Sequence, residues 1–112
     1  MIHQTQDQTL AAVAGLWTRF KETILGRVEV VEQAISALLE GELPDELRRK
    51  AERETHKLAG SVGSFGFKEA SRLACEIERS FHFGSMLGQA QASSLSERAA
   101  ALRRELESRP FG

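Results

Sequence analysis

His56 is the residue whose type and neighbours most clearly suggest chemistry. If the surrounding segment is helical, a turn of about 100° per residue places its imidazole roughly 160° from Leu58 and roughly 140° from Ala51, away from the apolar side. Gly60 and Gly63 follow four and seven residues later, where a side chain would overhang the ring. Each glycine inside a helix costs about 1 kcal/mol relative to alanine. We interpret the bare surface as a landing face for a partner that approaches an exposed histidine.

The other residues able to bind a metal or act as nucleophiles are scattered along the chain. His3, His56 and His82 are not at ligand spacing from one another, and Cys75 is the single cysteine. We therefore expect no metal site and no cofactor. A Cys75–His56 nucleophilic pair is less favoured, because Cys75 has apolar neighbours and neither a third member nor an oxyanion loop accompanies it. We expect Cys75 to be an inert, partly buried thiol.

The composition is that of one soluble helical domain. The chain has 112 residues, of which 41% are hydrophobic and 28% charged, with 2 prolines and no tyrosine. A net charge of −1 and interleaved acids and bases argue against nucleic-acid binding. The densest basic cluster is either a solvated helix face or an anion-attracting surface, and it comprises Arg48, Arg49, Lys50, Arg53 and Lys57.

Signals of export or membrane insertion are not evident. The uncharged stretches are shorter than the roughly 20 residues of a membrane span. Residues 1–8 have neither the basic flank nor the apolar centre of a secretory signal. A single cysteine agrees with a reducing compartment. We expect a cytoplasmic protein that does not bind a membrane.

Four helical segments must position the histidine. Apolar residues recur every three or four positions across residues 10–38, which predicts one long helix that can bend at Gly26. Within it, Trp17 and Phe20 are expected to face the core. Gly41 suits the left-handed position that follows such a helix.

Turn residues and periodicity define the remaining helices. Pro44 suits the first turn of a second helix, which ends at a turn over residues 63–66. A third helix over residues 67–81 and a loop over residues 82–88 follow. Residues 94–97, Ser-Leu-Ser-Glu, have the spacing of a capping box and predict the start of the last helix.

The expected fold is all-α, because no segment shows the period-two alternation of a strand. Short connections favour an antiparallel up-and-down four-helix bundle with a long N-terminal helix. We divide the chain into a flexible N-terminus (residues 1–8), the bundle (residues 9–107) and a tail (residues 108–112). Such a bundle can bury its apolar faces internally, so we expect a monomer.

Two stretches of the sequence resemble the signature of a known family. Residues 56–67 read His-Lys-Leu-Ala-Gly-Ser-Val-Gly-Ser-Phe-Gly-Phe, and residues 73–78 read Leu-Ala-Cys-Glu-Ile-Glu. Together they resemble histidine-containing phosphotransfer (HPt) domains, and the Phe-Gly-Phe ending is similar to that of the phosphotransfer domains of chemotaxis-type histidine kinases. The resemblance implies a four-helix bundle that displays one histidine. That histidine would accept a phosphoryl group from a receiver-domain aspartate or a kinase and pass it on.

The residue types suit this chemistry. A neutral imidazole is a good nucleophile near neutral pH, because its unperturbed pKa is about 6.5, and the phosphoramidate that it forms is labile enough to be passed on. The resemblance implies that His56 accepts the phosphoryl group on Nε2. It also implies that Glu78, 22 residues later, orients the ring through Nδ1–H, although Glu78 could also be an ordinary exposed acid. Mg²⁺ and the acceptor aspartate would belong to the receiver domain, so the chain would be a phosphocarrier rather than a stand-alone enzyme.

One position departs from the family pattern. Many members place a lysine three residues after the histidine, whereas this chain has Ala59. Lys57 or Arg53 could supply the missing positive charge, although neither is geometrically equivalent. Lys68 is a further candidate, and a solvated lysine is the simpler interpretation. The surface expected to contact a partner comprises Ala59, Gly60, Gly63 and Lys68.

The leading hypothesis is a phosphorelay intermediate of two-component signalling that exchanges phosphate with a receiver domain or a histidine kinase. The alternative is a helical interaction module that binds such a partner and is never phosphorylated, and Ala59 is its only support. A dimeric kinase-type phosphoacceptor module is disfavoured, because such modules place an acid directly after the histidine, where this chain has Lys57. The sequence shows no kinase or ATP-binding motif, and no nucleophile paired with an oriented base as a hydrolase would need.

Overall fold

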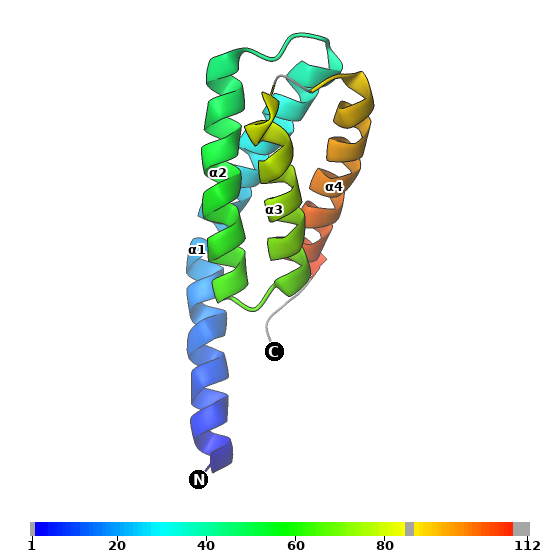
Figure 1. The fold of residues 1–112 in the computed structure, drawn as a ribbon. Helices are drawn as coiled ribbons and strands as arrows, with labels where there is room; N and C mark the ends of the chain where they lie inside the picture. The colour runs from blue at the N-terminus through cyan, green and yellow to red at the C-terminus, as the bar shows by residue number, and fades with distance from the viewer. Residues whose placement is uncertain (1, 85–86, 109–112) are drawn as a thin grey trace.

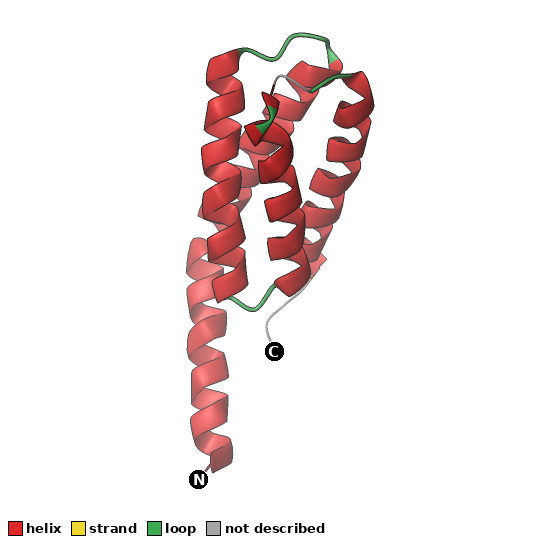
Figure 2. Cartoon of the chain, in the orientation of Figure 1, coloured by secondary structure: helices red, strands yellow, loops and turns green. Residues whose placement is uncertain are grey.

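The computed structural model describes residues 2–84 and 87–108, which form four helices joined by short connections (Figure 1, Figure 2). In chain order the helices are α1 (Ile2–Leu39), α2 (Asp45–Ser64), α3 (Lys68–His82) and α4 (Gln89–Ser108). Successive helices run in opposite directions, and α1 and α3 each contact both α2 and α4 (Figure 1). The described residues include neither a strand nor a helix with the length and apolarity needed to cross a membrane. The predicted all-α four-helix bundle is confirmed.

Helix α1 is longer than the bundle to which it belongs. Its N-terminal part projects past the other helices (Figure 1), and it stays helical through Gly26, where the sequence allowed a bend. Residues 2–8, which were set apart from the bundle in the sequence analysis, are helical and form the first turns of α1, where no glycine or proline precedes Gly15. Ser108 likewise belongs to α4, and residues 109–112 of the expected tail lie outside the described residues.

Two glycines in the left-handed conformation end α1 and α2. Gly41 has a φ of 89°, and its N–H donates to the carbonyl of Leu38 at 3.0 Å. The N–H of Glu42 donates to the carbonyl of Ala37 at 3.0 Å, which completes a Schellman motif. Gly66, with a φ of 85°, ends α2 in the same way. The turn at Gly66 folds α3 back along α2, and this helical hairpin carries the candidate site.

Helix α4 begins at Gln89, so the start predicted from residues 94–97 is wrong. Gly88 precedes the helix, and its N–H donates to Oε1 of Gln91 at 2.9 Å, as in a capping box with glutamine at the third position. Ser94 lies inside α4, where its Oγ accepts a hydrogen bond from Nη1 of Arg98 at 2.7 Å. The spacing of a capping box was not enough to locate the start of a helix, because serine and glutamate also occur three residues apart inside helices.

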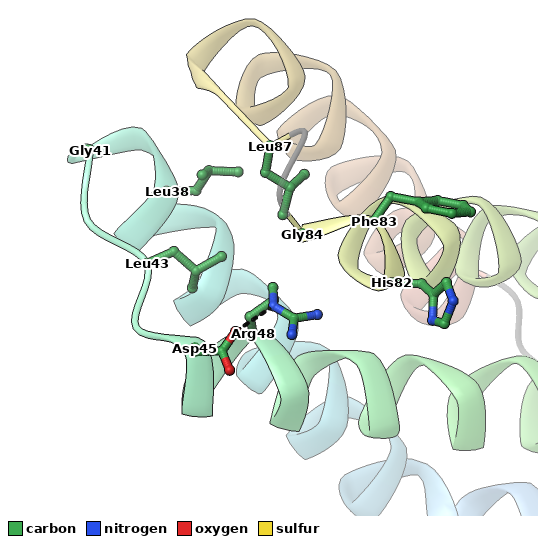
Figure 3. A pocket seen from close by; sticks show the side chains of 9 residues that line it. All are labelled: Leu38, Gly41, Leu43, Asp45, Arg48, His82, Phe83, Gly84 and Leu87. Atoms are coloured by element: carbon green, nitrogen blue, oxygen red, sulfur yellow. Dashed lines mark hydrogen bonds and ion pairs between the residues drawn. The ribbon is translucent and has the colours of Figure 1, made fainter.

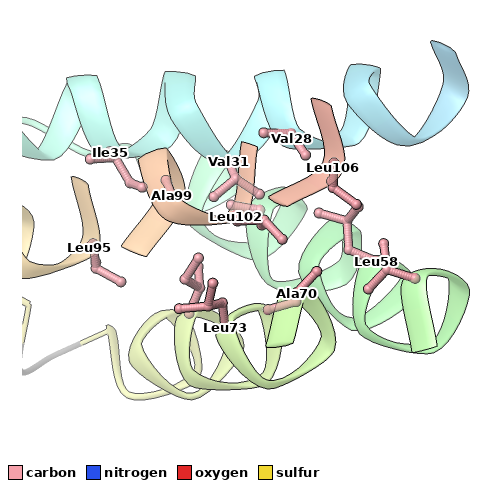
Figure 4. Packing of buried hydrophobic residues seen from close by; sticks show 14 of the residues in the cluster. Val28, Val31, Ile35, Leu58, Ala70, Leu73, Leu95, Ala99, Leu102 and Leu106 are labelled. Atoms are coloured by element: carbon pink, nitrogen blue, oxygen red, sulfur yellow. The ribbon is translucent and has the colours of Figure 1, made fainter. Parts of the chain in front are cut away.

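The core lies between the four helices and receives apolar side chains from each of them (Figure 4). At one end Trp17 packs against Phe65 and Phe67, with ring centroids 5.3 and 4.7 Å from its own. Phe20 was expected in the core but is 46% exposed. It lies about 60° around α1 from Trp17, at the edge of the buried stripe.

Candidate functional site

His56 lies on the face of α2 that points away from the core. Its side chain is 77% exposed, so the orientation predicted from the helical period is confirmed. The opposite face of α2 is buried and consists of Ala51, Thr55, Leu58 and Val62. The hydroxyl of Thr55 donates to the carbonyl of Ala51 at 2.7 Å, which satisfies a buried polar group directly beside the histidine. Burial on one side of α2 therefore fixes the backbone that presents the imidazole on the other.

Glu78 reaches this imidazole from α3. Its Oε2 lies 2.7 Å from Nδ1 of His56, and its side chain is partly buried. An ionised carboxylate can only accept a hydrogen bond, so in the neutral ring Nδ1 carries the proton and donates it. Nε2 is then the unprotonated nitrogen of the exposed ring. The geometry presents one nucleophilic nitrogen on a ring whose orientation is set by a second helix.

The residues of the expected partner-binding surface lie in different surroundings. A Cβ at Gly60 would meet nothing within 4 Å, whereas a Cβ at Gly63 would lie 3.3 Å from Oγ of Ser71. The Ser71 hydroxyl donates to the carbonyl of Ala59, which is half-buried against α3. Lys68 is exposed at the start of α3, about 15 Å along the helix axis from the level of the glutamate. Gly60 and Gly63 are both exposed, but of these two glycines Gly60 has the open surroundings, whereas a side chain at position 63 would press against Ser71 of α3.

The basic residues nearest the histidine on α2 are engaged to different degrees. Nζ of Lys57 lies 3.7 Å from Oε1 of Glu54, and Oε2 of Glu54 lies 3.4 Å from Nε of Arg27 on α1. Glu54 thus shares its charge between two cations. Arg53 is exposed one turn before His56. A phosphate on the histidine would have to compete with Glu54 for Lys57.

A second histidine–glutamate pair lies beside the first. Nδ1 of His82 is 3.3 and 3.4 Å from the two carboxylate oxygens of Glu52. Each pair joins the two helices of the hairpin, in opposite directions. Glu78 of α3 contacts His56 of α2, and Glu52 of α2 contacts His82 of α3. The sequence prediction missed this pair by placing His82 in a loop, whereas it is the last residue of α3. The available signal was the repeated Glu-x-x-x-His spacing at residues 52–56 and 78–82.

His82 also borders a cavity of about 620 Å³ at the end of the bundle (Figure 3). Arg48 crosses this region: its Nε lies 2.9 Å from Oδ1 of Asp45, and its Nη1 donates to the carbonyl of Phe81 at 2.8 Å. The hydrogen bond from Arg48 lowers the pKa of the Asp45 carboxyl. A Cβ at Gly84 would overlap Cδ of Arg48, so glycine is required there for the arginine to pass. Arg48 therefore ties the start of α2 to the end of α3 that carries His82.

Other metal-binding or nucleophilic side chains do not converge on this site. Across residues 2–84 and 87–108, no group of three or more histidine, cysteine, aspartate or glutamate residues is placed to hold a metal ion. Cys75 is half-buried on α3, three residues before Glu78. The distinctive feature of the hairpin is therefore its two histidine–carboxylate pairs.

Comparison with known proteins agrees with the motif around the histidine. The family model described as Hpt domain matches residues 15–109. Among curated proteins, the protein RcaC of Microchaete diplosiphon is 31% identical over 74 residues, which make up 66% of this chain and 11% of RcaC. The chain thus spans about a tenth of that relative's length. No solved structure gives a significant match.

Proposed function

The chain belongs to the Hpt domain family of two-component phosphorelays, and we propose that His56 is its phosphoacceptor. In the proposed reaction, Nε2 of His56 attacks the phosphorus atom of an aspartyl phosphate on a receiver domain. The N–P bond forms as the O–P bond breaks, and the aspartate carboxylate leaves. The reverse reaction passes the phosphoryl group to the same or another receiver. A histidine kinase is the other class of donor in this proposal.

The hydrogen bond between Glu78 and His56 is the observation that carries the proposal. At 2.7 Å from Nδ1, the carboxylate holds the tautomer in which Nε2 is the nucleophile. The same carboxylate stabilises the positive charge that the ring acquires when Nε2 forms its bond to phosphorus. Both effects need a fixed ring, and the packing of α3 on α2 supplies it.

The partner supplies the rest of the catalytic machinery in this proposal. Phosphoryl transfer needs in-line access and charge stabilisation more than covalent chemistry from the protein. The exposed ring and the open surface at Gly60 allow close approach. Mg²⁺ and the aspartate would both be brought by the receiver. We place this encounter in the cytoplasm, between a receiver and a monomer of this chain.

Positive charge near the phosphate is the part of the site that differs from the family pattern. Ala59 stands where many members have lysine, and its backbone is held against α3 by Ser71. We propose that Lys57 and Arg53 contribute the positive charge instead. Lys57 would turn from Glu54 toward the phosphoryl group, since a dianionic phosphate is a stronger partner than a shared carboxylate.

The test is phosphoryl exchange with a panel of receiver domains that have been phosphorylated chemically. The wild-type chain should acquire a label that is stable in base and labile in acid, as expected for phosphohistidine. His56→Gln should abolish the label. His3→Gln provides a matched control, because it removes another histidine of the same chain and should leave labelling unchanged.

Two outcomes would overturn the assignment. Label that persists in His56→Gln would place the phosphoacceptor elsewhere. A wild-type chain that binds a receiver, keeps its affinity after His56→Ala and never becomes labelled would instead be the unphosphorylated interaction module. Affinity measured by calorimetry, together with the labelling assay, separates these two outcomes.

A further inference from the structure

Glu52 is a second carboxylate within reach of His56. The two residues are four apart on α2, the spacing at which side chains on a helix surface become neighbours. A glutamate that precedes a histidine by four residues is in the favourable order for pairing with it. In the structure, however, Glu52 points across the hairpin, where both of its oxygens lie within 3.4 Å of Nδ1 of His82.

His82 is the residue that the Glu52 carboxylate contacts across the hairpin. Arg48, one turn before Glu52 on α2, is already bound to Asp45 and to the carbonyl of Phe81. Glu52 is partly buried, with 24% of its side chain exposed, so its side chain lies against α3 rather than in open solvent. Removing the His82 ring would leave the Glu52 carboxylate free to turn toward His56, its neighbour on α2.

We infer that His82 is a positioning residue that holds the Glu52 carboxylate away from the phosphoryl group on His56. The inference rests on the proposed function of His56. Glu78 is useful beside the ring because it binds Nδ1, on the side away from the nucleophilic nitrogen. A second carboxylate near Nε2 would repel the incoming phosphoryl group, which carries negative charge of its own. With this pairing, His56 is in contact with the carboxylate of Glu78, while the carboxylate of Glu52 is held at His82.

The experiment measures the rate at which phosphoramidate phosphorylates His56, because this small donor requires no partner. Nε2 forms its bond to phosphorus while the P–N bond of phosphoramidate breaks and ammonia leaves. His82→Ala should slow the reaction roughly threefold to tenfold at low salt, the size of a repulsion between two unit charges about 4 Å apart in water. Glu52→Gln should react at least as fast as the wild type, and the double variant should return to within about twofold of it.

Two further measurements separate this role from a merely structural one. The defect of His82→Ala should largely disappear at about 1 M salt, where charges are screened over roughly 3 Å. His82→Lys places a cation beside Glu52 that can hold the carboxylate, and it should stay within about twofold of the wild type. Thermal unfolding of every variant identifies any that fails to fold.

The inference is overturned if His82→Ala reacts at the wild-type rate. It is equally overturned if the defect persists in the double variant or at high salt, because the effect would then not come from the charge of Glu52. These outcomes differ from failure of the proposed function. In that case neither phosphoramidate nor a phosphorylated receiver would label the wild-type chain at His56.

Discussion

The hairpin of α2 and α3 carries two histidine–glutamate pairs made of the same residue types in different settings. His56 lies within α2 and is held by one short contact of 2.7 Å, whereas His82 ends α3 and shares two longer contacts of 3.3 and 3.4 Å. Open space at Gly60 adjoins His56, while the ring of Phe83 packs edge-on against His82 at 5.1 Å. A contact between a histidine and a carboxylate is therefore common to both pairs. A shorter contact and the open surface at Gly60 distinguish the first pair from the second.

The largest expected difference between the pairs is in phosphorylation itself. His56→Gln should lose all label from a phosphorylated receiver, because it removes the nucleophile. His82→Gln should still become labelled, at a reduced rate. Quantitative labelling, followed by identification of the modified peptide, checks both statements. Label found on His82 in the wild-type chain would contradict the prediction that only the histidine of the first pair accepts a phosphoryl group.

Sequence reasoning anticipated the first pair better than the second for physical reasons. The exposure of His56 follows from the period of one helix, which is a local property. The contact with Glu78 depends on how two helices pack, and it could be expected only from the family resemblance. His82 was missed because helix ends are set by capping contacts that propensity does not specify, and the predicted third helix stopped one residue too early.

Another error also arose where tertiary structure overrides local pattern. Phe20 fits the apolar period of α1, but the period does not reveal where the bundle ends. Gly63 is exposed like Gly60, but the period of α2 could not show that Ser71 of α3 lies beside it. The four-helix plan itself was predictable, because period and turn residues repeat along the whole chain.

The bare approach to His56 is tested by covering it. Gly60→Leu places a branched side chain where nothing now lies within 4 Å, and we expect transfer from a receiver to fall at least about tenfold through steric exclusion. Gly26→Leu is the matched control, since Gly26 is an exposed helical glycine of α1 with equally open surroundings. Both variants should unfold at higher temperature than the wild type, because leucine favours helix over glycine. Equal transfer rates for the two variants would show that the partner does not approach over Gly60.

The fixed ring is tested by changing the two glutamates in turn. Glu78→Gln should slow phosphorylation of His56 about tenfold, because the amide no longer imposes the Nδ1–H tautomer or stabilises the cation. Glu52→Gln should not slow it. Nitrogen chemical shifts of the His56 ring, measured in both variants, report the tautomer directly. A similar loss of rate in the two variants would mean that net charge, rather than ring orientation, matters at this site.

The two glycines after His56 should differ in their effect on stability. Gly60→Ala should raise the free energy of unfolding by about 1 kcal/mol, the difference in helix propensity. Gly63→Ala should gain less, because its Cβ would lie 3.3 Å from the Ser71 oxygen, which is held by the carbonyl of Ala59. Urea unfolding of each variant measures the gains. In a Ser71→Ala background, the stability gained from Gly63→Ala should approach that gained from Gly60→Ala. If Gly63→Ala still gained less in that background, Ser71 would not be the cause of the difference.

The smallest effect is expected from restoring the charge that position 59 lacks. Ala59→Lys puts a cation one turn after His56, and it should lengthen the lifetime of the phosphohistidine or speed its formation roughly twofold to threefold at low salt. The effect is limited because position 59 is half-buried against α3 and an exposed ion pair is weakened by solvent. Ala59→Gln adds a side chain of similar reach without charge and should leave both quantities unchanged. If Ala59→Gln lengthened the lifetime or sped the formation of the phosphohistidine equally, the change would come from packing rather than charge. The alanine would then not explain any difference in transfer between this chain and members of the family that carry the lysine.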